Sequence, residues 1–410
     1  MSDDAIVGAG HLGDRLARLR RLADLTQEGL SERCGVSVDV IRKLEQHRKH
    51  SVRLPTLHKL AAGLGVEVTG LLGDPPALKT EQGESPALVA VRRAIMPSPL
   101  APTAVEPDSA EPFSPDLLRA EIADGWTLYH AAEFEQLARS LPGIIDDARL
   151  AVAVGRGDKR AAARAALGKA FQLGGHLAIR LGKTDLALAS LERGQLAADS
   201  GDDPLLAPMV SNSIAWAYQR QNRLTDAQRL AIHAADGVER NGPRTANEVR
   251  VWGGLLISAA TSTGRAGDYE QASDMLKVAE SAAGRLAELP PPINGKLVSV
   301  FNRSAVRIER IRLAVQHGQP DTALFLARGI RLSSDTPPSW RTWLMLDIAR
   351  ARTEVGDVEG AVKALLALHR QAPQWIRHHT LAVAIVRDLW AGRARPVGLR
   401  RLAEILGVID

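Results

Sequence analysis

Hydrophobic positions recur with helical spacing along almost the whole chain. Residues 11–72, and the region from Asp116 to the C-terminus, place apolar residues three or four positions apart, which is the period of a helix that buries one face. The one segment with strand-like alternation, VSVDV at 36–40, lies inside such a helical stretch. Ala and Leu dominate the chain, whereas aromatic residues make up only 4% of it. The pattern therefore predicts an all-α fold class.

Residues 73–115 interrupt this pattern. They hold nine of the 22 prolines and keep no sustained period, apart from a short helix expected at 87–95. Proline-rich segments without a period are typical of linkers. We therefore expect a domain at residues 1–72, a linker at 73–115 and a helical domain at 116–410, so that two bodies can reorient.

Residues 11–72 carry the start and stop signals of a series of short helices. Thr26 is placed to cap one helix, Gly35 to end it in the left-handed conformation, and Ser37 to cap the next. Two short helices joined by a tight turn that contains glycine form a helix-turn-helix. The apolar residues spaced to face inward here are Leu30, Val36, Ile41 and Leu44. The five helices expected in this domain span roughly residues 12–24, 27–34, 38–46, 55–64 and 67–72.

This block resembles the DNA-binding domain of the phage Cro and lambda-repressor class of bacterial regulators, the XRE family, without a gap through the two central helices. The resemblance implies that Gln27, at the start of the second helix, holds a DNA phosphate. It also implies that Arg20 and Glu45 form a structural pair. Glu45 is therefore not counted among the residues that read bases.

The helix at 38–46 is the expected recognition helix, because its first turn would point toward base edges in the major groove. Ser37, Val38 and Asp39 are the candidate readers. Val38 could contact a thymine methyl group, and Asp39 could accept a hydrogen bond from a base amino group. Cations in and after this helix would contact phosphates. They are Arg42, Lys43, His47, Arg48, Lys49 and Arg53.

The expected partner is a double-stranded DNA operator. Residues 1–72 contain no Phe, Tyr or Trp, and proteins that bind single strands or RNA usually stack bases on such rings. The alternative interpretation of the cations is a solvated surface without a partner.

A repeated unit follows from Asp116 onward: a helix of small residues, a turn of Gly, Asn or Asp, and a second helix. The turn segments read HAAEFEQL, LGKTDLAL, QNRLTDAQ, RAGDYEQA, HGQPDTAL and EVGDVEGA. The anchor residues after these turns are Leu137, Ala187, Ala227, Ala272, Ala323 and Ala361. The unit resembles the tetratricopeptide repeat, whose helix pairs stack into a solenoid with a concave face.

In this register the first helices of successive units present polar and aromatic side chains to the concave face. The candidate effector-groove residues are Gln172, His176, Arg180, Asn212, Trp216, Gln219, Thr261, Arg312, Trp343 and Arg350. The domain order resembles peptide-responsive quorum-sensing regulators of Gram-positive bacteria, which implies a peptide or small-molecule effector. We also expect a homodimer formed through the helical body. The alternative is that these side chains pack against neighbouring helices or face solvent.

Charge and cysteine content narrow the classes of protein further. The chain has 52 Lys and Arg against 47 Asp and Glu, so no polybasic tail is expected. Cys34 is the single cysteine, which excludes a disulfide within the chain and favours a small buried apolar residue. Asp3 and Asp4 stand where a secretory signal carries Lys or Arg, and no apolar run is long enough to cross a bilayer. We expect a cytoplasmic, nucleoid-associated protein without a membrane partner.

One motif points instead to an enzyme. AIVGAGHLG at 5–13 has the spacing of a dinucleotide-binding turn, with glycines at Gly8, Gly10 and Gly13. Asp39 could then be the acid that binds the ribose. Only three apolar residues precede Gly8 within the motif, however, and no further strands complete a sheet. We interpret the motif as a coincidence in a glycine-rich tail.

No other group of residues indicates catalysis or a metal. His369, His378 and His379 have no acidic or cysteine partner at ligand spacing. We expect no catalytic residue, no metal and no cofactor. The sequence thus predicts a sequence-specific transcriptional regulator that binds double-stranded DNA and is controlled by a ligand or protein partner in its helical domain. The alternative is a protein-protein interaction scaffold with a weak DNA-binding head.

Overall fold

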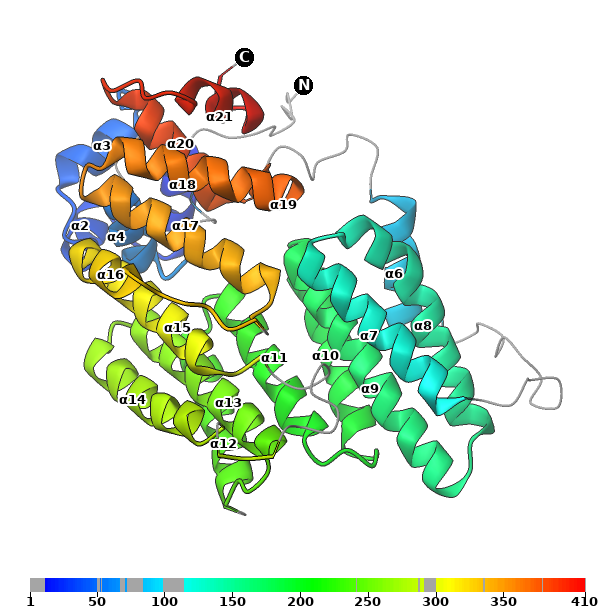
Figure 1. The fold of residues 1–410 in the computed structure, drawn as a ribbon. Helices are drawn as coiled ribbons and strands as arrows, with labels where there is room; N and C mark the ends of the chain where they lie inside the picture. The colour runs from blue at the N-terminus through cyan, green and yellow to red at the C-terminus, as the bar shows by residue number, and fades with distance from the viewer. Residues whose placement is uncertain are drawn as a thin grey trace, which may run out of the picture. The chain divides into compact units, whose positions relative to one another are not determined.

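All regular secondary structure in the described part of the chain is α-helical, which confirms the predicted fold class (Figure 1). The computed structural model describes residues 12–49, 52, 54–66, 71, 84–98, 114–240, 242–286, 288–290, 300–334, 336–377 and 379–409. The chain forms two compact units. Unit 1 comprises Met1–Glu81, Gly318–Ala327 and Thr342–Asp410, and unit 2 comprises Gln82–His317 and Arg328–Arg341. Over the described ranges, no helix is long and apolar enough to cross a membrane.

Four short helices at the start of unit 1 form a small bundle, which we call the head. They are α1 (Leu12–Leu22), α2 (Gln27–Cys34), α3 (Val38–Glu45) and α4 (Leu54–Leu64). Helix α3 packs on α1 and α2, and α2 also packs on α4. The core between them contains Leu16, Leu30, Ile41, Leu44 and Leu60, all fully buried. Leu71 is also buried, and the rest of the fifth predicted helix, at 67–72, lies outside the described residues.

Helix α1 ends two residues earlier than its pattern predicts. Asp24 adopts a left-handed conformation, with φ 52°. The amide of Leu25 then donates to the carbonyl of Arg20, which is the pattern of a helix end with one left-handed residue. The helical period of the sequence carried no signal for this stop, because Asp rather than Gly takes the left-handed position.

Two glycines allow the head helices to approach one another closely. A Cβ atom on Gly13 would overlap the backbone carbonyl of Leu44, so α1 and α3 touch at this residue. A Cβ atom on Gly63 would lie 2.6 Å from the Cβ of Cys34, where α4 meets α2. Cys34 itself is buried, as predicted. The last glycine of AIVGAGHLG is thus a helix-packing residue, and positions 5–11 lie outside the described residues.

The C-terminal helices also belong to unit 1. They are α16 (Pro320–Ala327), α17 (Pro338–Glu354), α18 (Val358–Gln371), α19 (Pro373–Arg377), α20 (Thr380–Ala391) and α21 (Leu399–Ile405), of which α17 begins in unit 2. Helix α18 packs against α19, α20 and α21. Helix α20 packs on α4 of the head as well, so segments from both ends of the chain share unit 1.

Unit 2 is a stack of helices in two series. Its helices are α6 (Pro86–Ile95), α7 (Pro115–Ala131), α8 (Phe134–Val154), α9 (Gly157–Arg180), α10 (Thr184–Ala198), α11 (Leu206–Arg220), α12 (Leu224–Glu239), α13 (Ala246–Arg265), α14 (Tyr269–Arg285) and α15 (Arg303–Gln316). From α7 onward nearly every helix packs on the next, and α7, α9, α11, α13 and α15 also pack on one another in that order. We call these five the inner helices. This two-layer order is typical of helical repeats.

The short helix expected at 87–95 is present as α6. The hydroxyl of Ser85 accepts from the amide of Leu88 and caps it. Leu88, Val91 and Ile95 are buried in the core of unit 2, and Glu84 accepts a hydrogen bond from Arg92. This part of the predicted linker is therefore packed against α8. The predicted domain boundaries themselves stay a prediction.

The six predicted turns share one backbone geometry, although their sequences differ. Each contains a single left-handed residue five positions before its anchor: Ala132, Gly182, Asn222, Gly267, Gly318 and Gly356 precede the anchors at 137, 187, 227, 272, 323 and 361. The six anchors are all at most 1% exposed. In five of the turns, the residue after the left-handed one donates its amide to a carbonyl five positions back, which satisfies the helix end. The six units thus share the backbone geometry of the turn and a buried anchor residue, although their sequences differ.

Candidate nucleic-acid interface

Helix α3 has one buried face and one exposed face. Ile41 and Leu44 are fully buried in the head, which fixes the rotation of the helix about its axis. Asp39, Arg42 and Lys43 therefore point outward and are exposed. This leaves the outer face of a short helix open to a groove of nucleic acid.

The turn before α3 follows the prediction in two of its three caps. Thr26 Oγ1 accepts from the amide of Gly29 at 2.9 Å, and Gly35 ends α2 with φ 64°. Ser37 occupies the N-cap position of α3, but its hydroxyl makes no capping hydrogen bond. The prediction that Ser37 caps α3 through its side chain is wrong, and its exposed hydroxyl stays among the candidate readers.

The predicted pair of Arg20 and Glu45 is present and mostly buried. Arg20 donates from Nε to Glu45 Oε1 at 2.8 Å and from Nη2 to Oε2 at 2.9 Å, while its Nη1 donates to the carbonyl of Leu25. Burial alone would raise the pKa of Glu45, but the hydrogen bonds from Arg20 and Gln27 hold that pKa below its usual value. The pair joins the end of α3 to the end of α1, so the ionised carboxylate stabilises the orientation of α3.

Gln27 lies at the start of α2, where the resemblance places a phosphate ligand. Its Nε2 donates to Glu45 Oε2 at 2.7 Å, so the amide is tied to the Arg20–Glu45 pair. The side chain is half-buried. A phosphate contact by Gln27 stays a prediction.

The outward charges of α3 pair with each other, and the turn after α3 contacts α1. Lys43 Nζ lies 2.7 Å from Asp39 Oδ2, and both side chains are more than half exposed. His47 takes a left-handed conformation with φ 57°, and its Nε2 lies 2.9 Å from Asp14 Oδ1 on α1. Of the remaining predicted cations, Arg48 and Lys49 are exposed, and Arg53 lies outside the described residues.

Two glutamines of the predicted groove connect neighbouring inner helices. Gln172 on α9 is buried, and its Nε2 donates to Ser213 Oγ of α11 at 3.0 Å. Gln219 on α11 is buried, and its Nε2 donates to Ser262 Oγ of α13 at 2.9 Å. Because each amide is used between packed helices, we leave both glutamines out of the groove that we propose below.

Three further candidates are also engaged within the helices. Thr261 on α13 donates to Glu309 Oε1 of α15 at 2.7 Å, and Arg312 donates to the other oxygen of Glu309 at 3.0 Å. Arg350 on α17, in unit 1, donates to Glu354 at 2.9 Å, and both side chains are buried. A buried carboxylate needs such partners, so these side chains serve the packing of their own unit.

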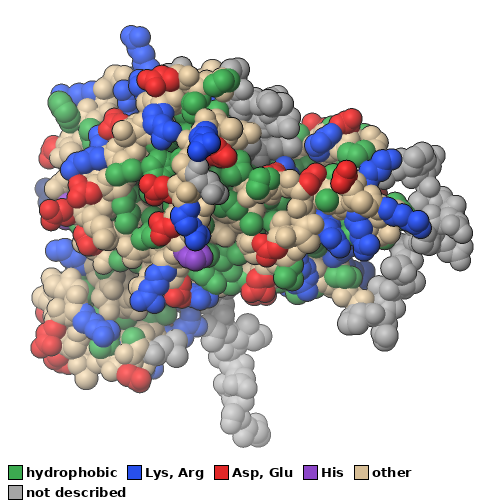
Figure 2. Space-filling view, turned by 90° about the horizontal axis from the view of Figure 1, so that it is seen from below, with side chains coloured by type: hydrophobic (Ala, Val, Ile, Leu, Met, Phe, Trp, Pro, Cys, Tyr) green, Lys and Arg blue, Asp and Glu red, His purple; other side chains and the backbone are tan. Residues whose placement is uncertain are grey.

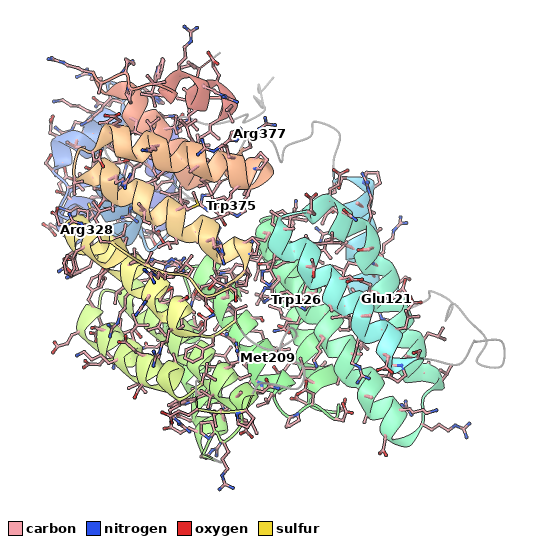
Figure 3. All side chains as sticks on the ribbon, viewed as in Figure 1. Glu121, Trp126, Met209, Arg328, Trp375 and Arg377 are labelled. Carbon is pink, nitrogen blue, oxygen red and sulfur yellow. The ribbon has the colours of Figure 1, made fainter. Side chains whose placement is uncertain are left out.

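The structure does bring three predicted groove residues together. The ring centroid of His176 on α9 lies 4.9 Å from that of Trp126 on α7 and 5.0 Å from that of Trp216 on α11. Arg180 lies over the Trp216 ring and donates from Nε to the hydroxyl of Tyr129 at 2.9 Å. We call these five residues the aromatic cluster. Figure 3 labels Trp126 on α7. Trp126 and Tyr129 were missed because the sequence register assigned no inner face to the first unit.

Hydrogen bonding fixes the protonation of His176. The hydroxyl of Ser213 donates to the carbonyl of Met209 and so accepts from His176 Nε2, 2.9 Å away. Nδ1 is then an unprotonated acceptor, buried without a hydrogen-bond partner among the described residues. Burial, with the charge of Arg180 and the proximity of His130, lowers the pKa of His176 to about 3. Burial and Arg180 likewise lower the pKa of His130 to about 4, so both rings are neutral near pH 7.

The remaining candidates lie apart from the aromatic cluster. Asn212 on α11 is half-buried. Trp343 belongs to unit 1, where its ring contacts those of Trp375 and His379. Within the described residues, no three His, Cys, Asp or Glu side chains gather as metal ligands would, and His378 lies outside those residues.

The head matches a known class of domain. Residues 11–71 match the family model described as a helix-turn-helix domain, which confirms that prediction. The chain is also similar to an immunity repressor protein of Bacillus phage phi105, with 32% identity over 73 residues. That alignment covers 18% of this chain and 50% of the repressor. The chain thus spans about half the length of this curated relative.

Proposed function

We propose that this protein is a transcriptional regulator that binds double-stranded DNA through the outward face of α3. The observation that carries the proposal is the geometry of α3: Ile41 and Leu44 hold it in the head, while Asp39, Arg42 and Lys43 are exposed. The match to a helix-turn-helix domain and the similarity to a phage repressor support it. In this proposal the first turn of α3 reads base edges, and the cations bind phosphates.

Lys43 and Asp39 change partners when DNA binds. In the free protein they form an exposed ion pair, which is worth less than about 1 kcal/mol. A phosphate that takes Lys43 releases the carboxylate of Asp39, which then accepts from a base amino group. Because the lost pair is weak and each phosphate contact releases counterions, the exchange favours the complex.

The test is the affinity of the full chain for duplex DNA as a function of salt. We expect Arg42→Ala with Arg48→Ala to weaken binding at least tenfold and to flatten the salt slope by about 2, since two phosphate contacts are lost. The matched control is Arg229→Ala, an exposed arginine of α12 in unit 2, which should change neither quantity. Equal binding by both variants would overturn the role of α3.

We further propose a homodimer that binds a two-fold operator. A dimer places two copies of α3 on successive major grooves on one side of the duplex. Light scattering should then give twice the chain mass of 44.0 kDa. Nuclease footprints should show two half-sites about one helical turn apart; a single protected segment and a monomer mass would contradict this.

The aromatic cluster is our candidate for control by an effector. It contains the rings of Trp126 and Trp216, the charge of Arg180, and the buried Nδ1 of His176, which has no hydrogen-bond partner among the described residues. These groups suit a peptide or small molecule that carries a carboxylate and an N–H group.

Addition of spent culture medium extract should change the tryptophan fluorescence and the DNA affinity together. Trp216→Leu should abolish both responses. Capture of protein partners that is unaffected by Arg42→Ala would favour the scaffold function instead.

A further inference from the structure

The C-terminal part of unit 1 concentrates exposed arginines. Residues 370–409 contain two acidic residues, Asp388 and Glu404, and seven arginines. The arginines, all exposed, are Arg370, Arg377, Arg387, Arg393, Arg395, Arg400 and Arg401. The excess of five equals the formal net charge of the whole chain, +5, so the rest of the chain is neutral in sum. On the face that Figure 2 draws, by contrast, positive and negative side chains are interspersed.

One of these arginines lies on a helix that adjoins the head. Helix α20 carries Arg387 and packs on α4. Arg15 on α1 donates from Nε to the carbonyl of Leu71 at 2.8 Å, which holds its guanidinium in place. Burial, and then the charges of Arg387 and Arg18, lower the pKa of Arg15. Arg15 and Arg18 lie three residues apart on α1, and α20, which carries Arg387, packs on α4 of the same head.

This group continues into the predicted DNA-binding surface. Asp14 on α1 contacts His47, in the turn after α3. Arg18 lies four residues after Asp14 and thus on the same side of α1, and it is exposed. Exposed positive side chains are thus present after α3 (Arg48), on α1 (Arg18) and on α20 (Arg387). Like charges on neighbouring segments repel one another in the free protein and are matched by the phosphates along a duplex.

We propose that α20 and the residues after it, through Arg387 and Arg393, make a second contact with the backbone of the duplex that α3 reads. The contact carries no sequence information, because it reaches phosphates only. It adds affinity and extends the protected segment beyond the base pairs under α3. This inference rests on the proposed function of the head.

The experiment uses the full chain and the double variant Arg387→Ala with Arg393→Ala. Binding is measured over a salt series to a mixed-sequence duplex about twice the length covered by the head, and to one about that length. We expect the variant to flatten the salt slope on the long duplex by about 2 and to weaken binding there about tenfold. On the short duplex it should match the wild type. The control is Arg139→Ala with Arg229→Ala, two exposed arginines of unit 2.

Several results would contradict a contact between α20 and the duplex. A slope on the long duplex equal to that of the control variant would overturn it, while DNA binding by the head would stand. Equal losses on both duplexes would also overturn it, because the arginines would then act through the fold of the head. Retained duplex binding with lost adhesion to anionic lipid vesicles would assign the surface to membranes instead. No binding by the wild-type chain to either duplex would overturn the function proposed for the head itself.

Discussion

The head and the inner helices of unit 2 differ in the exposure of their polar side chains. In the head, Arg42 and Lys43 are exposed because, among the described residues, no helix covers that side of α3. In unit 2, Gln172 and Gln219 are buried because each inner helix is covered by the next one in the series. Helical spacing indicates which side chains share a face. It does not indicate whether a neighbour covers that face.

The largest effect should come from Gly13→Ala in the head. A Cβ atom there meets the backbone of Leu44, which cannot move without shifting α3. We expect the free energy of unfolding of the head to fall by about 4 kcal/mol, seen as faster amide hydrogen exchange in α1 and α3. The control Gly237→Ala, in α12, has only the far end of Arg240 near its added methyl group. It should stabilise its helix by about 1 kcal/mol; the opposite order of the two variants would refute the packing role of Gly13.

The stabilities of unit 2 and of the head should respond differently to acid. His130 and His176 have lowered pKa values, of about 4 and about 3. Below pH 6.5 these two histidines are therefore protonated in the unfolded chain but remain neutral in the folded chain. Unit 2 should lose stability as the pH falls below about 6.5, by up to about 1.4 kcal/mol per pH unit for each histidine. The lowered pKa of Glu45 stabilises the head above pH 4.5, and that contribution is lost only as the pH falls below this value.

Tryptophan fluorescence does not report on the head, because residues 1–72 contain no tryptophan. It reports on unit 2 and on the C-terminal helices of unit 1, so the response to His176→Gln assigns the change to unit 2. We expect the urea midpoint from fluorescence to fall between pH 7 and pH 5, and His176→Gln to reduce that fall. Hydrogen exchange in α3 should stay constant over the same range. A fluorescence midpoint that is independent of pH above 5 would contradict the neutral, buried state of the two histidines.

A smaller effect on stability should come from the buried hydrogen bonds between inner helices. Gln219→Leu keeps the volume but removes the donor to Ser262, and should cost about 2 kcal/mol in unit 2. Gln228→Leu is the matched control, since Gln228 makes an exposed hydrogen bond to Gln271 and should change stability by less than about 0.5 kcal/mol. Equal stability of the two variants in urea unfolding would return Gln219 to the list of groove candidates.

The smallest effects concern the repeated turns. Gly182 has no neighbour within 4 Å of an added Cβ, so Gly182→Ala should cost only the left-handed conformation, about 1 kcal/mol. Ala132 holds the same position in the first turn with φ 64°, and Ala132→Gly should stabilise unit 2 by up to about 1 kcal/mol. Thermal unfolding of the two variants should shift in opposite directions, and shifts of the same sign would count against a shared turn geometry.

Local signals in the sequence were sufficient for much of this fold. The caps at Thr26 and Gly35 and the six anchor residues depend on nearby residues, and the structure places them as predicted. The contact between α20 and α4, and the burial of Gln172, depend on pairs of residues far apart in the chain. No periodicity within one helix carries that information. The candidate DNA surface was accessible to prediction because it lies within two consecutive helices, whereas the aromatic cluster draws on α7, α9 and α11.

The central claim is that the first turn of α3 selects the DNA sequence. It is tested most directly by selecting bound duplexes from a random pool with the wild-type chain and with Asp39→Ala, and comparing the enriched sequences. We predict that both proteins enrich a defined motif, and that the variant loses its preference at one base pair of each half-site while its salt slope stays the same. Identical motifs from the two proteins, or no enrichment by the wild type, would contradict the account.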